Sequence, residues 1–248
     1  MKIGGILDIS TIDIPGKVSM VIFTVGCNFR CNFCHNKHLL DVNIGKSYQV
    51  SEIVKLCKNN SLINSISISG GEPTLQEDIL DVCKGLKKLE KYLSIDTNGS
   101  NPDKLKELIP YINRVALDLK GPFDQNKLKE ITGVNIDLDK IIETIEFLKV
   151  QKGLDFEIRT TFFESLLTPV NLEEILNSLK EIEFKGNYVI QQFQYFEGVG
   201  KKFKDLFLKP EHEVLLKLLK PYRYKRFPFK IFLRDETVGY SIIDKLYS

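Results

Sequence analysis

The sequence contains no long apolar run. Its longest apolar stretches, such as residues 18–25, cover about eight residues, whereas a helix that crosses a membrane needs about 20. The opening segment, "MKIGGILDIST", has one lysine and lacks the apolar core of a secretory signal peptide. These absences argue against a membrane protein and against a secreted one, so we expect a cytoplasmic location.

An excess of charge of one sign is also missing. The chain has 35 Lys and Arg residues against 33 Asp and Glu residues, a formal net charge of +2 at pH 7. This balance does not create the positive field on which a dedicated nucleic-acid-binding protein depends. We interpret the mildly basic segment "KPYRYKRFPFK" as solvated surface, and we expect no nucleic-acid partner.

Cysteine is scarce but unevenly placed. Three of the five cysteines, Cys27, Cys31 and Cys34, lie within eight positions, with the spacing C-x3-C-x2-C. Cytoplasmic proteins rarely contain disulfides, so a close group of cysteines indicates a metal site.

The order of segments predicts an α/β fold. Short β-branched or aromatic runs alternate with amphipathic stretches, which is typical of repeated βαβ units around a parallel sheet. The predicted strands cover residues 18–25, 65–69, 92–96, 114–119, 156–163 and 188–194. Six strands predict a partial (β/α)6 barrel, similar to an incomplete TIM barrel.

We expect residues 1–248 to form a single domain, since a chain of this length suits one large barrel domain. Its core would cover about residues 15–195. About residues 196–248 would decorate the core, with a helix over residues 211–220 and a strand or extended segment over residues 228–234.

Chemically active residues follow the predicted strands. The three cysteines come after the first strand, "SGGEP" after the second, "DTNG" ends the third and "DLKG" the fourth, while Arg159 lies in the fifth and "QQFQ" in the sixth. The C-terminal ends of the strands of a (β/α) barrel share one face, which holds the active site. The sequence therefore predicts one large site.

The cysteine group allows two kinds of metal site. A structural zinc ion takes four ligands, and His35 or His38 could be the fourth, although His35 directly follows Cys34 and would reach the same ion poorly. A [4Fe–4S] cube normally takes four thiolates, so three cysteines would leave one iron open. Cys57 and Cys83 lie on apolar faces of predicted helices, and we interpret both as core residues.

Five motifs together carry a family resemblance. The cysteine spacing, with Phe33 before the last cysteine, is followed by "CHN", "SGGEP" at 69–73, "DTNG" at 96–99 and "DLK" at 118–120. The set resembles the radical S-adenosylmethionine (SAM) enzymes that activate glycyl-radical enzymes, and "TIDIPG" at 11–16 is similar to their leader segment. Residues from about 5 to about 195 carry the resemblance, which is strongest to the anaerobic ribonucleoside-triphosphate reductase activating proteins.

Three alternatives stay open beside this interpretation. One is an activator of the pyruvate formate-lyase type. Another is a radical SAM enzyme that acts on a small molecule or RNA, similar to 7-carboxy-7-deazaguanine synthase. The third is a zinc or iron–sulfur binding module without catalysis, which leaves the motifs at the strand ends unexplained.

The resemblance implies a radical SAM oxidoreductase. Cys27, Cys31 and Cys34 would hold a [4Fe–4S] cluster whose open iron binds SAM, and reduction would cleave SAM to a 5′-deoxyadenosyl radical that takes hydrogen from a glycine of the partner. The implied partners are a glycyl-radical enzyme and a flavodoxin or ferredoxin-type electron donor.

The resemblance also implies the site residues. The catalytic set would be the three cysteines and Lys120. The residues implied to bind the cofactor are Phe33, Cys34, His35, Gly70, Gly71, Glu72, Asp96, Asn98, Asp118, Lys120, Arg159 and Gln194. Asp96, Thr97 and Asp118 match a monovalent-cation site. Plain structural roles remain for several of these, namely tight turns at the glycines and at Asn98, an exposed position for Lys120 and a simple ion pair for Arg159.

Overall fold

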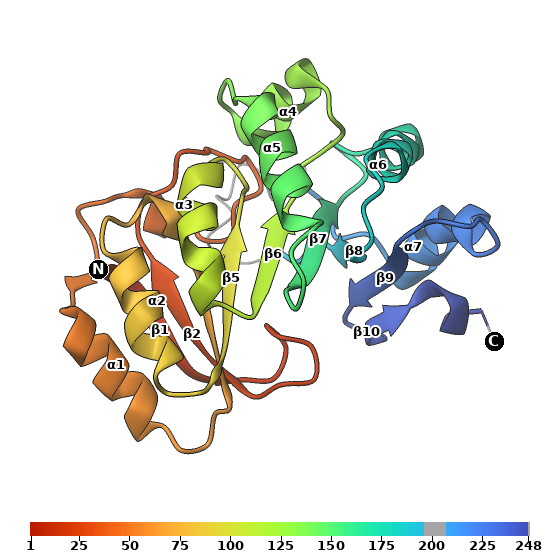
Figure 1. The fold of residues 1–248 in the computed structure, drawn as a ribbon. Helices are drawn as coiled ribbons and strands as arrows, with labels where there is room; N and C mark the ends of the chain where they lie inside the picture. The colour runs from red at the N-terminus through yellow and green to blue at the C-terminus, as the bar shows by residue number, and fades with distance from the viewer. Residues whose placement is uncertain (196–206, 248) are drawn as a thin grey trace. The chain divides into compact units, whose positions relative to one another are not determined.

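The computed structural model describes residues 1–195 and 207–247, and the chain divides into two compact units (Figure 1). The first unit comprises Met1–Asn28, Asn36–Leu117 and Asp139–Phe156. The second unit comprises Phe29–His35, Asp118–Leu138 and Glu157–Ser248. The single domain over residues 1–248 stays a prediction, and residues 196–206 and 248 of the predicted C-terminal decoration lie outside the described residues.

The sheet of the first unit runs in the order β3-β1-β2-β4-β5-β6. Its strands are β1 (Lys2–Ser10), β2 (Ser19–Thr24), β3 (Lys46–Ser47), β4 (Ser65–Gly70), β5 (Tyr92–Thr97) and β6 (Arg114–Asp118). Strands β2, β4, β5 and β6 are parallel to their neighbours, while β1 is antiparallel to both β2 and β3. The four parallel strands confirm the predicted ones to within a residue or two.

Strand β1 was not among the predicted strands. Its sequence, "KIGGILDIS", has two glycines near its middle, and glycine weakens a strand because it has no side chain to pack. The strand forms because it pairs with β2, with Ile6 opposite Ile22 and Leu7 opposite Val21. Pairing between segments thus outweighs the local preference of the chain.

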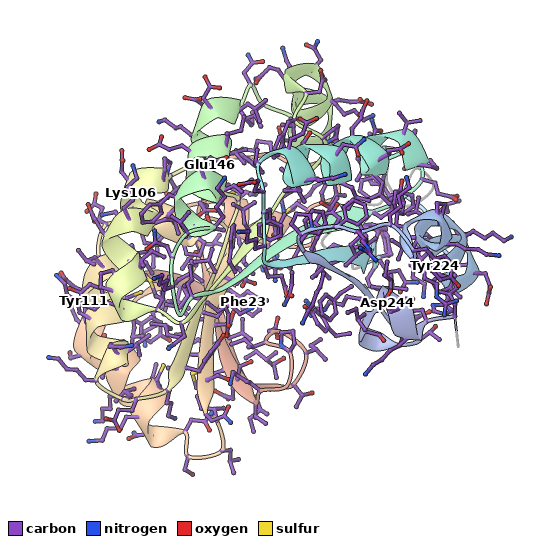
Figure 2. All side chains as sticks on the ribbon, turned by 45° about the vertical axis from the view of Figure 1, so that its right-hand side comes forward. Phe23, Lys106, Tyr111, Glu146, Tyr224 and Asp244 are labelled. Carbon is purple, nitrogen blue, oxygen red and sulfur yellow. The ribbon has the colours of Figure 1, made fainter. Side chains whose placement is uncertain are left out.

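The helices of the first unit are α1 (Val50–Asn59), α2 (Ile79–Lys87), α3 (Pro102–Leu108) and α5 (Leu138–Leu148). Figure 1 shows α1, α2 and α3 side by side. The Cys57 sulfur of α1 lies 3.8 Å from the Met20 sulfur of β2, which fixes the sheet face that α1 covers. Lys106 of α3, labelled in Figure 2, is exposed and forms an ion pair with Glu143 of α5.

The two faces of this sheet differ in chemistry. Successive side chains of a strand point to opposite faces, so Met20 faces the helices and Phe23, labelled in Figure 2, points to the other side. The parallel register pairs Ile68 with an isoleucine of β5 on the helical face, and it pairs Ser67 with Ser94 on the opposite face. The helical face is therefore apolar, whereas the opposite face carries polar groups.

The sheet of the second unit runs in the order β7-β8-β9-β10. Its strands are β7 (Asp155–Phe162), β8 (Asn187–Gln192), β9 (Lys230–Asp235) and β10 (Gly239–Ile242), and its helices are α4 (Gln125–Thr132), α6 (Pro169–Glu181) and α7 (His212–Leu219). Strands β7, β8 and β9 are parallel, and β10 returns antiparallel to β9. The predicted helix over 211–220 and strand over 228–234 are confirmed as α7 and β9.

The C-terminal residues extend the sheet of the second unit. Gln192, at the end of β8, donates from Nε2 to the carbonyl of Pro210 at 2.8 Å and accepts from the amide of Glu236 at 3.2 Å. His212 of α7 lies 2.6 Å from the carboxylate of Asp235, measured from Nδ1 to Oδ2. These contacts tie the C-terminal strands and helix to β8.

Neither set of strands closes on itself, and most of the pairings are parallel. The predicted α/β fold with an incomplete barrel is therefore confirmed. Among the described residues, no helix is both long enough and apolar enough to span a membrane.

Candidate functional site

The loop after β4 in the first unit is bonded to the segment just before Cys27. The amide of Gly71 donates to the carbonyl of Thr24 at 2.9 Å, and the amide of Glu72 donates to the carbonyl of Gly26 at 2.8 Å. The "SGGEP" loop and the start of the cysteine loop thus form one hydrogen-bonded element.

The two glycines of this loop permit a close backbone approach. Gly70 has φ +108°, a conformation that residues with a side chain rarely adopt. A Cβ on Gly71 would lie 2.0 Å from the carbonyl oxygen of Gly26. Both glycines are therefore required by contacts within this chain, as the turn interpretation predicts, and their contact with SAM stays a prediction.

Glu72 joins the loop after β4 to the end of β5. Its side chain is buried, and Oε1 accepts from the hydroxyls of Thr74 at 2.6 Å and Thr97 at 2.8 Å, while Oε2 accepts from the amide of Asn98 at 2.7 Å. Burial raises the pKa of Glu72, although these hydrogen bonds to the charged form oppose the effect. Thr74 was not among the predicted residues, and its place two positions after Glu72 is the only sequence signal for it.

Asp96 lies on the polar face of the same sheet. Arg114, at the start of β6, places Nη1 2.9 Å from Ser94 Oγ and 3.7 Å from Asp96 Oδ1. Arg114 is only 4% exposed, and a buried guanidinium requires such partners. The sequence did not reveal Arg114, because its neighbours in β5 become known only from the strand register.

Asn98 brings the "DTNG" loop to Cys27. Its Nδ2 lies 2.8 Å from Asn28 Oδ1 and 3.9 Å from Cys27 Sγ. Asn28 in turn donates from Nδ2 to Ser100 Oγ at 2.8 Å. The first cysteine of the motif is therefore held against the end of β5, and neither Asn28 nor Ser100 was among the predicted residues.

The rest of the cysteine loop, Phe29–His35, belongs to the second unit and is held by the end of α4. The amide of Arg30 donates to the carbonyl of Thr132 at 2.9 Å, and the amide of Asn32 donates to that of Ile131 at 3.4 Å. Carbonyls in the last turn of a helix lack partners within the helix. The end of α4 thus supplies acceptors that fix the backbone on both sides of Cys31.

An aromatic cluster packs beside this loop. Phe33 lies 4.9 Å from Phe163 between ring centroids, Phe163 lies 5.3 Å from Phe193, and the ring of His35 lies 5.5 Å from Phe193. Burial and the charge of Lys120 lower the pKa of His35, which favours the neutral imidazole at pH 7. The packing fixes the orientations of Phe33 and His35.

Asp118, Lys120 and Arg159 form a charged group in the second unit. Arg159 Nε lies 2.8 Å from Asp118 Oδ1, and Lys120 Nζ lies 3.1 Å from Asp118 Oδ2. Burial alone raises the pKa of Asp118, but the two cations outweigh it and lower this pKa to about 2. Burial lowers the pKa of Lys120, yet Asp118 and the Cys31 thiolate outweigh it and raise this pKa. The ion-pair interpretation of Arg159 is thus what the structure shows.

The charged group predicts a pH dependence of stability. Because the pKa of Asp118 falls from 3.8 to about 2 on folding, its contribution is complete above pH 3.8 and is lost as the pH falls toward 2. The lowered pKa corresponds to about 2 kcal/mol. In the cluster-free chain, Asp118→Asn should lower the free energy of unfolding much more at pH 6 than at pH 2.

The matched control is Asp103→Asn, which removes a carboxylate that is 87% exposed and pairs with Lys106 on the surface. Exposed ion pairs contribute little, so this variant should behave like the wild type at both pH values. An Asp118→Asn loss that is equal at pH 2 and pH 6 contradicts the prediction.

Gln194 lies at the end of the sixth predicted strand, just beyond β8. Its Nε2 donates to Gln192 Oε1 at 2.5 Å, and its backbone hydrogen-bonds to His35. The structure thus brings Gln194 to the cysteine loop of the second unit, and contact with the SAM ribose stays a prediction.

The two remaining cysteines lie in the core, as the sequence predicts. Cys57 and Cys83 are fully buried, and burial raises the pKa of each thiol to about 12. Such thiols remain protonated and do not bind metal readily. His38 is exposed.

The donor set fits an iron–sulfur cluster. None of the five cysteines is in a disulfide, so disulfide formation does not prevent Cys27, Cys31 and Cys34 from serving as ligands. Within the described ranges, the His, Cys, Asp and Glu side chains form no group of three or more that could hold a single metal ion. Each thiolate of a [4Fe–4S] cube binds a different iron, so its ligands need not converge on one point.

Comparisons with known proteins define the class. The family model of the radical SAM superfamily matches residues 21–190. A protein of Methanocaldococcus jannaschii with the provisional name glycyl-radical enzyme activating enzyme is 36% identical over 89% of this chain and 92% of its own length. A protein of Saccharolobus islandicus with the provisional name GTP 3′,8-cyclase is 30% identical over 73% of this chain and 58% of its own length.

The fold comparison agrees. The crystal structure of Streptococcus suis SuiB bound to S-adenosylmethionine matches with a TM-score of 0.66 at 19% identity, over 87% of this chain and 50% of SuiB. At this identity the likeness shows the fold alone. The chain belongs to the radical SAM superfamily. It is therefore an enzyme of the class that uses SAM and a [4Fe–4S] cluster.

Proposed function

We propose that this enzyme activates a glycyl-radical enzyme by abstracting a hydrogen atom from a glycine of that partner, and that the partner is an anaerobic ribonucleotide reductase. The observation that carries the activator role is the 36% identity over 89% of the chain to a relative with the provisional name glycyl-radical enzyme activating enzyme, a name that does not specify the partner. The motifs "CHN", "DTNG" and "DLK" support it because they resemble those of such activators.

In this proposal Cys27, Cys31 and Cys34 hold the [4Fe–4S] cluster. The cluster and SAM, when bound, supply a one-electron cleavage that gives a 5′-deoxyadenosyl radical. The protein contributes the fixed backbone around these cysteines, through the end of α4 and through the loop after β4. A flavodoxin or ferredoxin-type protein is the proposed electron donor. The cytoplasmic location stays a prediction from the sequence.

Lys120 is proposed to bind the carboxylate of SAM. Asp118 and the Cys31 thiolate keep this lysine charged, and a compact ammonium is a suitable partner for a carboxylate. Arg159 shares the charge of Asp118, so Lys120 retains positive charge for a second anion. The ring centroid of Phe33 lies 5.9 Å from Lys120 Nζ, within the range of a cation–π contact.

The other predicted SAM contacts stay proposals of the same kind. The support for them is of three kinds: burial, a position close to a motif cysteine along the chain, or membership of the hydrogen-bonded loop after β4. The residues are Cys34, His35, Gly70, Gly71, Glu72, Asp96, Asn98, Asp118, Arg159 and Gln194.

A monovalent cation at Asp96, Thr97 and Asp118 is a further part of the proposal. Buried oxygen atoms of carboxylates and hydroxyls suit such an ion, and Asp96 and Thr97 are both buried. Arg114 near Asp96 and the two cations on Asp118 already neutralise much of the negative charge. The proposed ion would therefore bind weakly.

The experiment starts with anaerobic reconstitution of the chain with iron and sulfide. Reduction with dithionite in the presence of SAM should release 5′-deoxyadenosine. Addition of a purified anaerobic ribonucleotide reductase should give the electron paramagnetic resonance (EPR) doublet of a glycyl radical on that protein. An intact cluster without SAM cleavage contradicts the activity, and cleavage without any radical on the reductase contradicts the choice of partner.

The same experiment separates the alternatives. A glycyl radical on pyruvate formate-lyase but not on the reductase would favour the second type of activator. The likeness to the relative named as a GTP cyclase supports a small-molecule substrate instead. In that case SAM cleavage should be stimulated by a nucleotide, and no protein radical should form on either partner.

A further inference from the structure

We propose that Asn98 donates a hydrogen bond from Nδ2 to the sulfur of Cys27 and so makes a cluster held by Cys27 easier to reduce. The inference rests on the proposed function, because it takes Cys27 as a ligand of the cluster. It gives Asn98 a tuning role through the sulfur, which is separate from the SAM contact proposed for this residue above.

The contacts of Asn98 leave little freedom for its side chain. Nδ2 lies 2.8 Å from Asn28 Oδ1 and 3.9 Å from Cys27 Sγ, and Oδ1 accepts from the amide of Ser100 at 3.0 Å. The two N–H groups of a primary amide can serve two acceptors. Because the Ser100 amide can only donate, the atom that faces it must be the oxygen, which turns Nδ2 toward Cys27 and Asn28.

The backbone of Asn98 is fixed by Glu72. The amide of Asn98 donates to Glu72 Oε2 at 2.7 Å, and Glu72 Oε1 is bonded to both Thr74 and Thr97. The carboxylate and the asparagine are 1% and 6% exposed, so water does not compete strongly for these bonds. The position of Nδ2 is therefore set by a buried network that reaches across two strand ends.

The sulfur is fixed from the other side. Gly26, directly before Cys27, accepts from the amide of Glu72 at 2.8 Å, and Asn28, directly after it, donates to Ser100 Oγ at 2.8 Å. The network that orients Asn98 thus also positions the residues on both sides of Cys27. The same set of hydrogen bonds therefore holds both the donor, Asn98 Nδ2, and the acceptor, Cys27 Sγ.

A donor at this sulfur favours the reduced cluster. Reduction adds negative charge that is shared with the thiolate ligands, and hydrogen bonds to the sulfurs are among the factors that set the potential of an iron–sulfur cluster. The effect is larger where exposure is low, because the surroundings screen the charge weakly. Loss of the donor should make reduction harder.

The test compares reconstituted Asn98→Ala with the wild type in an EPR-monitored redox titration without SAM. At a fixed potential, the ratio of reduced to oxidised cluster should fall about three- to tenfold, which equals a shift of about 28 to 59 mV for one electron. Asn32→Ala is the matched control, because it removes an asparagine side chain of the cysteine loop that donates to the carbonyl of Glu130 at 3.4 Å and leaves the network around Asn98 in place. Its potential should match the wild type.

Two further variants keep the result interpretable. Asn98→Asp retains the oxygen that accepts from Ser100 but lacks the donor and adds negative charge, so its potential should fall further than that of the alanine variant. Cys27→Ser should lose the cluster, since Cys27 is taken as a ligand. If Cys27→Ser retains a wild-type cluster, the assignment of Cys27 in the proposed function fails.

The inference itself fails if clusters assemble in the Asn98 variants with unchanged potential. An unchanged potential with weaker SAM binding would assign Asn98 to SAM instead. Should neither variant assemble a cluster, wild-type protein grown with 15N-asparagine decides the matter by pulsed EPR of the reduced cluster. The label should change the nitrogen modulation, and an unchanged spectrum overturns the proposal.

Discussion

Replacing Cys34 with alanine is expected to abolish the iron–sulfur chromophore and to lower 5′-deoxyadenosine formation more than about 100-fold. Loss of a residue that only supports a metal ligand typically lowers metal affinity or activity about 10- to 100-fold, and loss of the ligand itself should lower them more. With two thiolates, two irons of the cube would lack a protein ligand. Iron analysis, the visible spectrum and the SAM cleavage assay measure the effect.

The controls for this prediction are the two buried cysteines. Cys57→Ala and Cys83→Ala each remove a fully buried sulfur far from solvent, and we expect a normal cluster with a stability loss of about 1 kcal/mol from the small cavity. A cluster that survives Cys34→Ala but is lost in Cys57→Ala or Cys83→Ala would show that the ligand assignment is wrong.

Replacing Gly71 with alanine is the second change with a large expected effect. The added methyl would lie 2.0 Å from the carbonyl oxygen of Gly26, a backbone atom that no rotamer change can move. The loop after β4 must then separate from the segment before Cys27. We expect a loss of about 3 kcal/mol in the free energy of unfolding of the cluster-free chain, at the upper end for overpacking, measured by urea denaturation.

Two other glycines isolate the cause. Gly153 has φ +77° with no atom within 4 Å of an added Cβ, so Gly153→Ala tests backbone strain alone, at about 1 kcal/mol. A Cβ on Gly5 would lie 3.8 Å from Phe23, an ordinary contact, so Gly5→Ala should change little. If all three variants lose equal stability, the close approach at Gly71 does not have the proposed importance.

The parts of the fold that the sequence predicts well are those with a strong local pattern. Strands β4 and β5 are confirmed almost to the residue, because their β-branched residues alternate and turn signals follow. Strand β1 and the four-residue strand β10 were missed. Glycines weaken the first signal and shortness weakens the second, so both depend on pairing with a neighbouring strand.

The candidate site divides in the same way. The cysteine spacing, "SGGEP", "DTNG" and "DLK" are contiguous, so sequence alone predicts them as functional. Arg114, Thr74 and Ser100 carry no motif, and they join the site only through partners on other strands or loops. Such residues become visible only when the register between segments is known.

The sequence by itself indicated the class of enzyme, because the cysteine spacing and four further contiguous motifs together resemble those of radical SAM activators. Only the tertiary structure decided what the residues around that loop do. Glu72 accepts from Asn98, which is 26 residues away, and Arg159 pairs with Asp118, which is 41 residues away. Burial and charge pairing act between atoms that are close in space, and the order of residues along the chain does not specify those distances.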